Sequence, residues 1–597
     1  MKKYNKVLAA ALCLCLALSC LGMTASAEGA GVANPGTYTA SAVGKNGDVT
    51  LTVTYSENAV TDIQVEEAET PTIGGAAIEA MTAQVLAEQT LTPDAVSGAT
   101  ETGRAYLAAL ADTAAQAGAE GFGAVAAEAE SVDYAVTEAD VIIVGAGGAG
   151  LTAAYTAAEQ GASVILLEKS GVVGGNSLCS QQGVNAADSA VQAELGMEFA
   201  TKELLKEATM SYGGRENLAE AYAAASGETV DWFAQELGIE WSGKTGDRVD
   251  SANPLASVLS DHPGGGDVFM VKANADGYTS LTLVNALSRA LESAGVVLYK
   301  NTEATALLTD DSGAVVGVKA VGANGEEVEF SGKAVLLATG GFGQNHEMLV
   351  ELRPDFANAI TDEIAPTTGD GIRMAEELGA KTVDLAEMQT FPHVPYGDTW
   401  LPPMAIPGGF RTTAVYVNQD AQRYTTEGFE TADATLQQTM AFCIFREEDL
   451  NDNLALLAAR GLVKSGDTPA ALAEALGLDP DALTATVEQW NADCAAGADS
   501  QFENQSLKPL AGKLYGYRFG VGAHYMMGGL LINENTQVLD ESEQPIPGLY
   551  AAGEVTGGLH GTVRIDGSGT GDAFVMGHVA GASAASYAMS GAESAAA

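Results

Sequence analysis

A glycine-rich turn carries the clearest chemical signal in the sequence. It follows an apolar stretch at residues 140–144, typical of a buried strand, and it opens an alanine-rich stretch that favours a helix. Gly145 permits a tight turn, Gly147 lets the backbone approach a pyrophosphate, and Gly150 lets the helix and the strand pack closely. Glu168 ends the next predicted strand, where its carboxylate would bind ribose hydroxyls. Together these residues predict a dinucleotide site at a helix N-terminus.

A hydroxyl-bearing motif, Ser97 to Thr100, is a candidate attachment site for a second cofactor. It lies between a stretch with strand-like alternation, 36–56, and a helix expected to end near Gly118, with Asp94 upstream. Its small residues leave room around the Thr100 hydroxyl. The motif resembles the flavinylation site of FMN-binding domains, in which a dedicated transferase joins a threonine hydroxyl to the FMN phosphate. The resemblance implies covalent FMN on Thr100 and an FMN transferase as a partner during maturation.

Three further segments, 174–177, 338–343 and 548–555, are also rich in glycine. They resemble the recurrent FAD contacts of the succinate dehydrogenase/fumarate reductase flavoproteins, and the similarity runs from about residue 140 to the C-terminal region. With the FMN motif in front, the chain is most similar to secreted fumarate reductase-like and urocanate reductase-like flavoproteins. The resemblance implies non-covalent FAD. The residues it assigns to the cofactors are Thr100, Gly145, Gly147, Gly150, Glu168, Lys169, Gly175, Asn176, Ser177, Gly183, Thr339, Gly340, Asp370, Glu554, Ser568 and Thr570.

The same resemblance implies an α/β fold. A Rossmann-type FAD-binding domain would carry an inserted α+β capping domain, and a small α+β FMN-binding domain would precede both. The expected boundaries are an export signal at 1–27, the FMN-binding domain at 32–118, a linker at 119–139, the FAD-binding domain at 140–386 and 524–597, and the capping domain at 387–523.

Two segments match the substrate-binding residues of this family. The segment that begins at His524 resembles His-x-Thr-Met-Gly-Gly, and the segment 557–564 ends in Arg564, at the place of the substrate-binding arginine. An imidazole donor and a fixed guanidinium can polarise a carboxylate or carbonyl conjugated to an alkene, so that they stabilise the charge that develops as hydride arrives. Both residues are therefore predicted to be catalytic.

One substrate position departs from the family pattern. Where the family has Gln-x-His-Pro, this chain has Phe391, with His393 two residues later as a partial substitute. Phe391 would either present its ring to a planar substrate or pack in the core. Because the clamp for a dicarboxylate is then incomplete, fumarate is a less favoured substrate.

The proton donor departs as well. The family's Thr-Arg-Asp becomes residues 431–433, Thr-Ala-Asp, which lack the arginine. Saturation of a C=C bond still needs a proton beside the carbon that takes the hydride. The candidates are Arg411, Tyr424, Tyr525 and a water held by Glu430, and our hypothesis is that Arg411 or a tyrosine takes this role.

Composition and the N-terminus indicate the compartment. The 597 residues include 28 Lys plus Arg and 78 Asp plus Glu, a formal charge of −50 that disfavours nucleic acid as a partner. A basic start, an apolar run at 7–21 and the small residues 25–27 predict an export signal. Ser19-Cys20 also resembles a lipoprotein site, so the protein is expected to be secreted or attached to the cell surface. The cysteines after the signal form no Cys-x-x-Cys pair, so neither a zinc cluster nor a c-type haem is expected.

Three functions remain open at this point. The favoured one is an exported reductase of anaerobic respiration, in which electrons pass from FMN to FAD and then to a urocanate-like or aryl-acrylate-like alkene. Its partners would be this small-molecule acceptor and a membrane-linked electron donor. The alternatives are a desaturating dehydrogenase that resembles the 3-ketosteroid dehydrogenases, and a surface electron carrier without catalysis.

Overall fold

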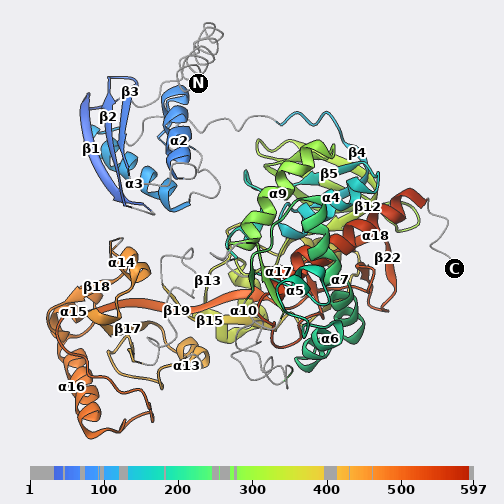
Figure 1. Ribbon diagram of the computed structural model, residues 1–597. Coiled ribbons are helices and arrows are strands. Elements are labelled where there is room, and N and C mark those ends of the chain that lie inside the picture. Colours follow the sequence, from blue (N-terminus) through green and yellow to red (C-terminus); the bar gives the residue numbers. More distant parts are fainter. Residues whose placement is uncertain are drawn as a thin grey trace. The chain divides into compact units, whose positions relative to one another are not determined.

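The protein is divided into two compact units, residues 1–129 and 130–597 (Figure 1). The computed structural model describes residues 32–44, 47–67, 74–91, 93, 100–119, 132–180, 183–244, 255, 269–273, 278–395, 413–428, 431–459 and 461–590. Several sequence predictions lie outside these residues. They are the export signal with Cys20, the motif residues Ser97 to Ala99, Arg411 and Glu430.

The first unit is a three-stranded antiparallel sheet with two helices (Figure 1). Strand β2 alternates buried and partly buried residues, so that Leu51, Val53 and Tyr55 share one core with Tyr106 and Leu110. This alternation is what one apolar face of an antiparallel sheet requires. The elements are β1 (Gly36–Val43), β2 (Asp48–Tyr55), β3 (Val60–Glu66), α2 (Gly74–Glu88) and α3 (Thr100–Ala117).

The second unit is built around an eight-stranded sheet in the order β10-β11-β12-β4-β5-β9, to which β22 and β21 are added beside β12. Strands β9, β5, β4, β12 and β22 run parallel, and residues 141–144 of β4 are buried on both faces. An apolar run of this kind fits a parallel strand covered by helices on each side. The strands are β4 (Glu138–Val144), β5 (Val164–Leu167), β9 (Val297–Tyr299), β10 (Thr302–Thr309), β11 (Val315–Gly322), β12 (Glu327–Leu337), β21 (Gln537–Leu539) and β22 (Pro545–Ala551).

Helices and small sheets surround this core, and α4 packs against both α9 and α18. The helices are α4 (Gly148–Glu159), η1 (Gly175–Leu178), α5 (Ala190–Glu194), α6 (Lys202–Ser211), α7 (Glu216–Glu236), α9 (Thr279–Ser293), α10 (His346–Leu352), η3 (Pro354–Asn358), α11 (Asp370–Glu376), α17 (Ser568–Gly571), η6 (Asp572–Met576) and α18 (Gly577–Ser590). The small sheets comprise β6 (Val184–Asn185), β7 (Gly243–Lys244) and β8 (Met270–Lys272), and β14 (Thr382–Val383), β20 (Gly529–Leu531) and β23 (Thr556–Gly557). No helix among the described residues is both long and apolar enough to cross a membrane.

A second, mixed sheet includes the long strand β19 (Leu514–Met526), which pairs with β13, β15, β17 and β18. Through this pairing Phe391 of β15 lies opposite Gly522, only two residues before His524. The other elements are β13 (Ile360–Thr361), β15 (Met388–Pro395), β16 (Val415–Asn418), α13 (Ala432–Leu436), β17 (Ala441–Arg446), η5 (Glu447–Asp449), α14 (Asp452–Ala459), β18 (Lys464–Gly466), α15 (Pro469–Leu476) and α16 (Pro480–Ala496). The predicted α/β fold class is confirmed.

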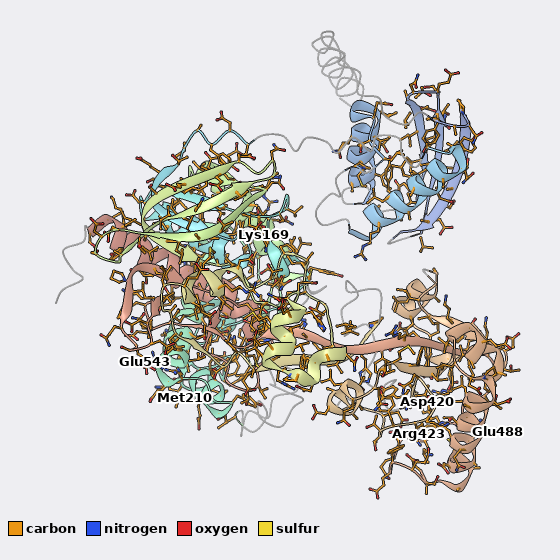
Figure 2. The ribbon with its side chains drawn as sticks, turned by 180° about the vertical axis from the view of Figure 1, so that it is seen from behind. Lys169, Met210, Asp420, Arg423, Glu488 and Glu543 are labelled. Carbon is orange, nitrogen blue, oxygen red and sulfur yellow. The ribbon has the colours of Figure 1, made fainter. Side chains whose placement is uncertain are left out.

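A buried ion network stabilises the region around α16, and its loss should be measurable. Arg423, labelled in Figure 2, donates to Glu427 and Asp499 at 2.8 and 2.9 Å, and these three side chains are at most 1% exposed. We expect Arg423→Met to lower the free energy of unfolding by about 3–5 kcal/mol, because two buried carboxylates lose their cation. Lys206→Met, which breaks surface pairs with Glu216 and Glu220, should lower the free energy of unfolding far less, because solvent screens these pairs.

The pH dependence gives this prediction a sign. Hydrogen bonds from Arg423 hold the pKa of the Asp499 carboxyl below its ordinary value. The stabilisation is therefore complete above the ordinary aspartate range, near pH 4, and is lost as the pH falls through the lowered pKa of the folded state. Calorimetry should show that the difference in the free energy of unfolding between wild type and Arg423→Met becomes smaller below about pH 4. A difference in the free energy of unfolding that stays constant from neutral to acid pH would contradict this account.

Candidate active site

A single cavity of about 590 Å³ in the second unit contains most of the predicted site residues. The residues after β4, β5, β12 and β22 line one part of it, and β15 and β19 line another. The carboxyl ends of parallel strands are where open α/β sheets bind ligands. The predicted residues in the lining are Gly145, Gly147, Glu168, Lys169, Gly175, Asn176, Ser177, Thr339, Gly340, Asp370, Phe391, His524, Glu554, Arg564 and Thr570.

The glycine turn has the geometry that a dinucleotide requires. Gly145 has a φ of +99°, and a Cβ there would lie 2.4 Å from the Ala338 carbonyl oxygen. A Cβ on Gly150 would lie 1.8 Å from the Gly145 oxygen, so helix α4 could not pack this closely. By contrast, the nearest atom to a Cβ on Gly147 would be 4.0 Å away. Gly147 therefore leaves space at the N-terminus of α4, which suits a pyrophosphate.

The acidic and basic residues of this part are held in place. The Glu168 carboxylate accepts the backbone N–H of Ala146 at 2.9 Å and that of Ser170 at 2.8 Å. Lys169, labelled in Figure 2, pairs with Asp370 at 2.5 Å. The unpartnered Oγ1 of Thr339 is a further buried polar atom beside the cavity. These features fit the dinucleotide part of FAD.

Three of the residues predicted to bind FAD are not among the described residues that line the cavity. They are Gly150, Gly183 and Ser568. Gly150 provides the close packing just described. A Cβ on Gly183 would lie 2.2 Å from the Val271 oxygen, so this glycine is required by packing against β8. The Ser568 hydroxyl is buried and accepts a hydrogen bond from Asn185 at 2.9 Å. In the structure, Gly150 and Gly183 thus permit close packing, and Ser568 holds Asn185 through a hydrogen bond.

Gly150→Ala should therefore yield protein with little bound FAD, because the added methyl forces α4 away from β4 and deforms the phosphate cradle. The ratio of flavin to protein absorbance after purification measures this loss. Gly520→Ala in β19 is a matched control, since its Cβ would make only ordinary contacts with Ile360, the nearest at 3.4 Å. Full FAD content in Gly150→Ala would contradict the role given to this glycine.

At the other part of the cavity, His524 and Phe391 are in contact. Their ring centroids are 4.1 Å apart at an interplanar angle of 70°, and both side chains line the cavity. Nδ1 of His524 lies 2.8 Å from Oδ2 of Asp362. Phe391 thus borders the cavity and also packs on the histidine, and whether its ring contacts a substrate stays a prediction.

Arg564 is fixed from two sides. Its Nε donates to Gln389 Oε1 at 2.7 Å, and its guanidinium lies over the Tyr525 ring at 4.7 Å. The residue is only 6% exposed but lines the cavity. A guanidinium held in this way is preorganised to receive an anionic oxygen.

The two tyrosines that the sequence offered as proton donors do not present a free hydroxyl to the cavity. Tyr424 is not among the described residues of the lining, and its hydroxyl lies 2.9 Å from that of Thr435, in a separate core cluster. Tyr525 lines the cavity, but its hydroxyl donates to Asp572 at 2.9 Å, and burial raises its pKa well above the ordinary value. His393 is buried against the rings of Tyr416 and Phe519, so it does not replace the missing substrate histidine.

Sequence reasoning missed two acids in the lining, Asp362 and Glu363. Two adjacent acids shortly before the glycine-rich segment that contains Asp370 were a usable signal. Glu363 is 4% exposed and lacks a hydrogen-bond partner at Oε1, while Glu554 accepts the Met526 N–H at 2.9 Å. Burial, and then the charge of Glu554, raise the pKa of Glu363 well above the ordinary value, and burial also raises the pKa of Glu554. This wall of the cavity is therefore acidic.

Comparison with known proteins identifies the family. Residues 140–570 match the FAD binding domain family and residues 44–115 match the FMN-binding domain family. The chain belongs to the fumarate reductase-like family of FAD-dependent oxidoreductases. It is 33% identical to a urocanate reductase of Eggerthella lenta, over 94% of both chains. It is 32% identical to an NADH:fumarate oxidoreductase of Klebsiella pneumoniae, over 92% of this chain and 58% of that protein.

Among solved structures, the open conformation of a flavocytochrome c3 fumarate reductase is similar, with a TM-score of 0.68 and 31% identity over 76% of this chain and 79% of that one. The protein is thus a flavin-dependent oxidoreductase with an FAD-binding and an FMN-binding domain. Within this family, Ala432 stands where the proton-donating arginine is expected, and the structure places Ala432 in the cavity lining. That position supplies no acid in this chain.

Proposed function

We propose that this oxidoreductase is an exported reductase that adds hydrogen across the C=C bond of a planar, enoate-type acceptor, such as urocanate or an aryl acrylate. The observation that carries the proposal is one cavity that joins the dinucleotide turn at Gly147 to the Arg564 guanidinium and the His524 imidazole. FAD, when bound, supplies the hydride. Arg564 would bind the carboxylate or carbonyl conjugated to the alkene and stabilise the negative charge that develops there.

The charges of the lining favour a monoanionic acceptor. Of the described residues that line the cavity, Lys169 and Arg564 carry a permanent positive charge, and Lys169 is paired with Asp370. Arg564 therefore remains for one carboxylate. A second carboxylate would find no second unpaired permanent cation among the described residues of the lining, where Asp362 and Glu363 lie instead. Beside these acids, Phe391 offers an aromatic surface to the part of the acceptor remote from its carboxylate, and this surface suits an aryl or imidazole ring.

The electron supply is part of the same proposal. The match to an FMN-binding domain and the Thr100 motif support a covalent FMN that passes electrons to FAD. The basic and apolar N-terminus supports export, and a membrane-linked carrier would then be the donor. Such a reductase would serve anaerobic respiration.

Oxidation of reduced viologen in the presence of single acceptors tests the proposal. We expect turnover with urocanate or cinnamate-type acrylates to exceed turnover with fumarate. Photoreduced enzyme should also be reoxidised by the alkene. Reduction of the oxidised enzyme by the saturated compound would instead indicate a desaturating dehydrogenase. Cycling with dyes alone, without turnover of any alkene, would indicate an electron carrier.

A further inference from the structure

The cavity needs an acid that the family arginine does not provide here. Hydride addition to one alkene carbon must be completed by a proton on the neighbouring carbon. Ala432 cannot donate it, the Tyr525 hydroxyl is directed to Asp572, and Tyr424 lies in another core cluster. The described lining must therefore be searched for another group that can hold a proton and reach a ligand.

His524 meets both conditions. Its side chain is 30% exposed and lines the cavity, whereas the Asp362 side chain is 8% exposed. An ionised carboxylate can only accept a hydrogen bond, so Nδ1, 2.8 Å from Asp362 Oδ2, carries a proton. Nε2 is then the nitrogen available to a ligand. In the doubly protonated ring Nε2 is a donor and can pass its proton to a ligand.

We propose that Nε2 of His524 donates the proton that completes reduction of the alkene, and that Asp362 is its positioning residue. The inference rests on the proposed function. FAD, when bound and reduced, would supply hydride to one alkene carbon, and the π electron pair of the alkene would form the second C–H bond with the proton from Nε2. The imidazole would then be neutral and the hydride donor oxidised. Two electrons from the donor and two protons from solvent then restore the resting state.

The groups around His524 agree with this assignment. On the loop after β13, Asp362 faces Nδ1, and the buried acids Glu363 and Glu554 line the same cavity. From β15, Phe391 packs its uncharged ring on the imidazole. Arg564 is the opposing positive charge, and it lies over the ring of the next residue, Tyr525. Asp362 is thus the acid that contacts the imidazole directly.

Two variants separate proton donation from mere binding. His524→Gln keeps a hydrogen-bond donor but cannot ionise, so we expect kcat with urocanate or the best acrylate to fall about 10²–10⁴-fold. The Kd of the oxidised enzyme for the same compound, measured from flavin absorbance, should stay within about threefold. Asp362→Asn should move the alkaline limb of the pH–kcat profile towards lower pH by about one unit or more. Asp355→Asn, in the Arg353 ion pair outside the described lining, is the matched control and should keep the wild-type profile.

A spectroscopic measurement makes the test independent of turnover. The chain has six histidines, so the His524 signals can be assigned in a sample labelled with ¹⁵N in its histidines by comparison with His524→Gln. We follow the ¹⁵N signals of His524 as the pH rises. We expect the change from the doubly to the singly protonated ring to occur at a higher pH in the wild type than in Asp362→Asn.

The outcomes are distinguishable. If no alkene reoxidises the wild-type enzyme, the proposed function fails, whatever the histidine titration shows. If the wild type is active but His524→Gln keeps its kcat, the inference alone is overturned. It is also overturned if His524→Gln loses activity only through weaker binding, or if Asp362→Asn leaves both the pH profile and the histidine titration unchanged.

Discussion

Replacement of Arg564 by methionine should lower kcat/KM for the proposed acrylate-type acceptor by about 10³-fold or more, because loss of one preorganised donor already costs about 10²–10³ and here a charge is lost as well. Methionine has a similar length and retains contact with the Tyr525 ring, so the change removes mainly the guanidinium. Arg564→Lys should recover only part of the activity, since an ammonium cannot bind a carboxylate in the two-pronged geometry of a guanidinium. Initial rates of viologen oxidation over a range of acceptor concentrations measure the effect.

The charge of the acceptor provides an internal control for this experiment. The corresponding neutral amide should lose less than the acrylate in Arg564→Met, because it has no carboxylate to pair. Arg353→Met removes a guanidinium that pairs with Asp355 outside the described lining, so it should leave kcat/KM unchanged. Equal losses for the acid and the amide, with full FAD content, would show that Arg564 does not bind the carboxylate.

The residues that the sequence singled out and that line the cavity in the structure belong to segments with a distinctive local pattern. The turn at Gly145 and Gly147 follows from a strand, a close approach and a helix within one short segment, and the structure shows the same sterics. Arg564 and His524 were found because each belongs to a distinctive segment. Strand patterning likewise predicted the alternation in β2. Local geometry of this kind is encoded within a few residues.

The interactions between these residues could not be predicted from the sequence. Asp362 and His524 are 162 positions apart, and they meet because β13 and β19 pair in parallel, with Thr361 opposite Ala523. The direction of the Tyr525 hydroxyl depends on Asp572, which lies in η6, 47 positions further along the chain. No periodicity in the chain indicates which strands of distant segments pair, and that pairing decides which acid faces the imidazole.

Thr100→Ala should abolish the covalent flavin altogether, since alanine offers no oxygen to which the FMN phosphate could be joined. Thr100 is the first residue of α3 in the structure. Protein produced together with the flavin transferase should give a fluorescent band on a denaturing gel for the wild type and none for the variant. Thr61→Ala, an exposed position in β3 of the same unit, is a matched control and should keep the band.

The same variant tests whether FMN is the entry point for electrons. The FAD cavity lies within the second unit, whereas Thr100 is in the first, so the FAD content of Thr100→Ala should be unchanged. Small reduced viologens can reach FAD directly, and the variant should therefore keep turnover with viologen while it loses turnover with a membrane-linked donor. If both activities survive, electrons do not need FMN to reach the second unit. If the fluorescent band itself survives, another residue carries the flavin, and the role assigned to Thr100 is wrong.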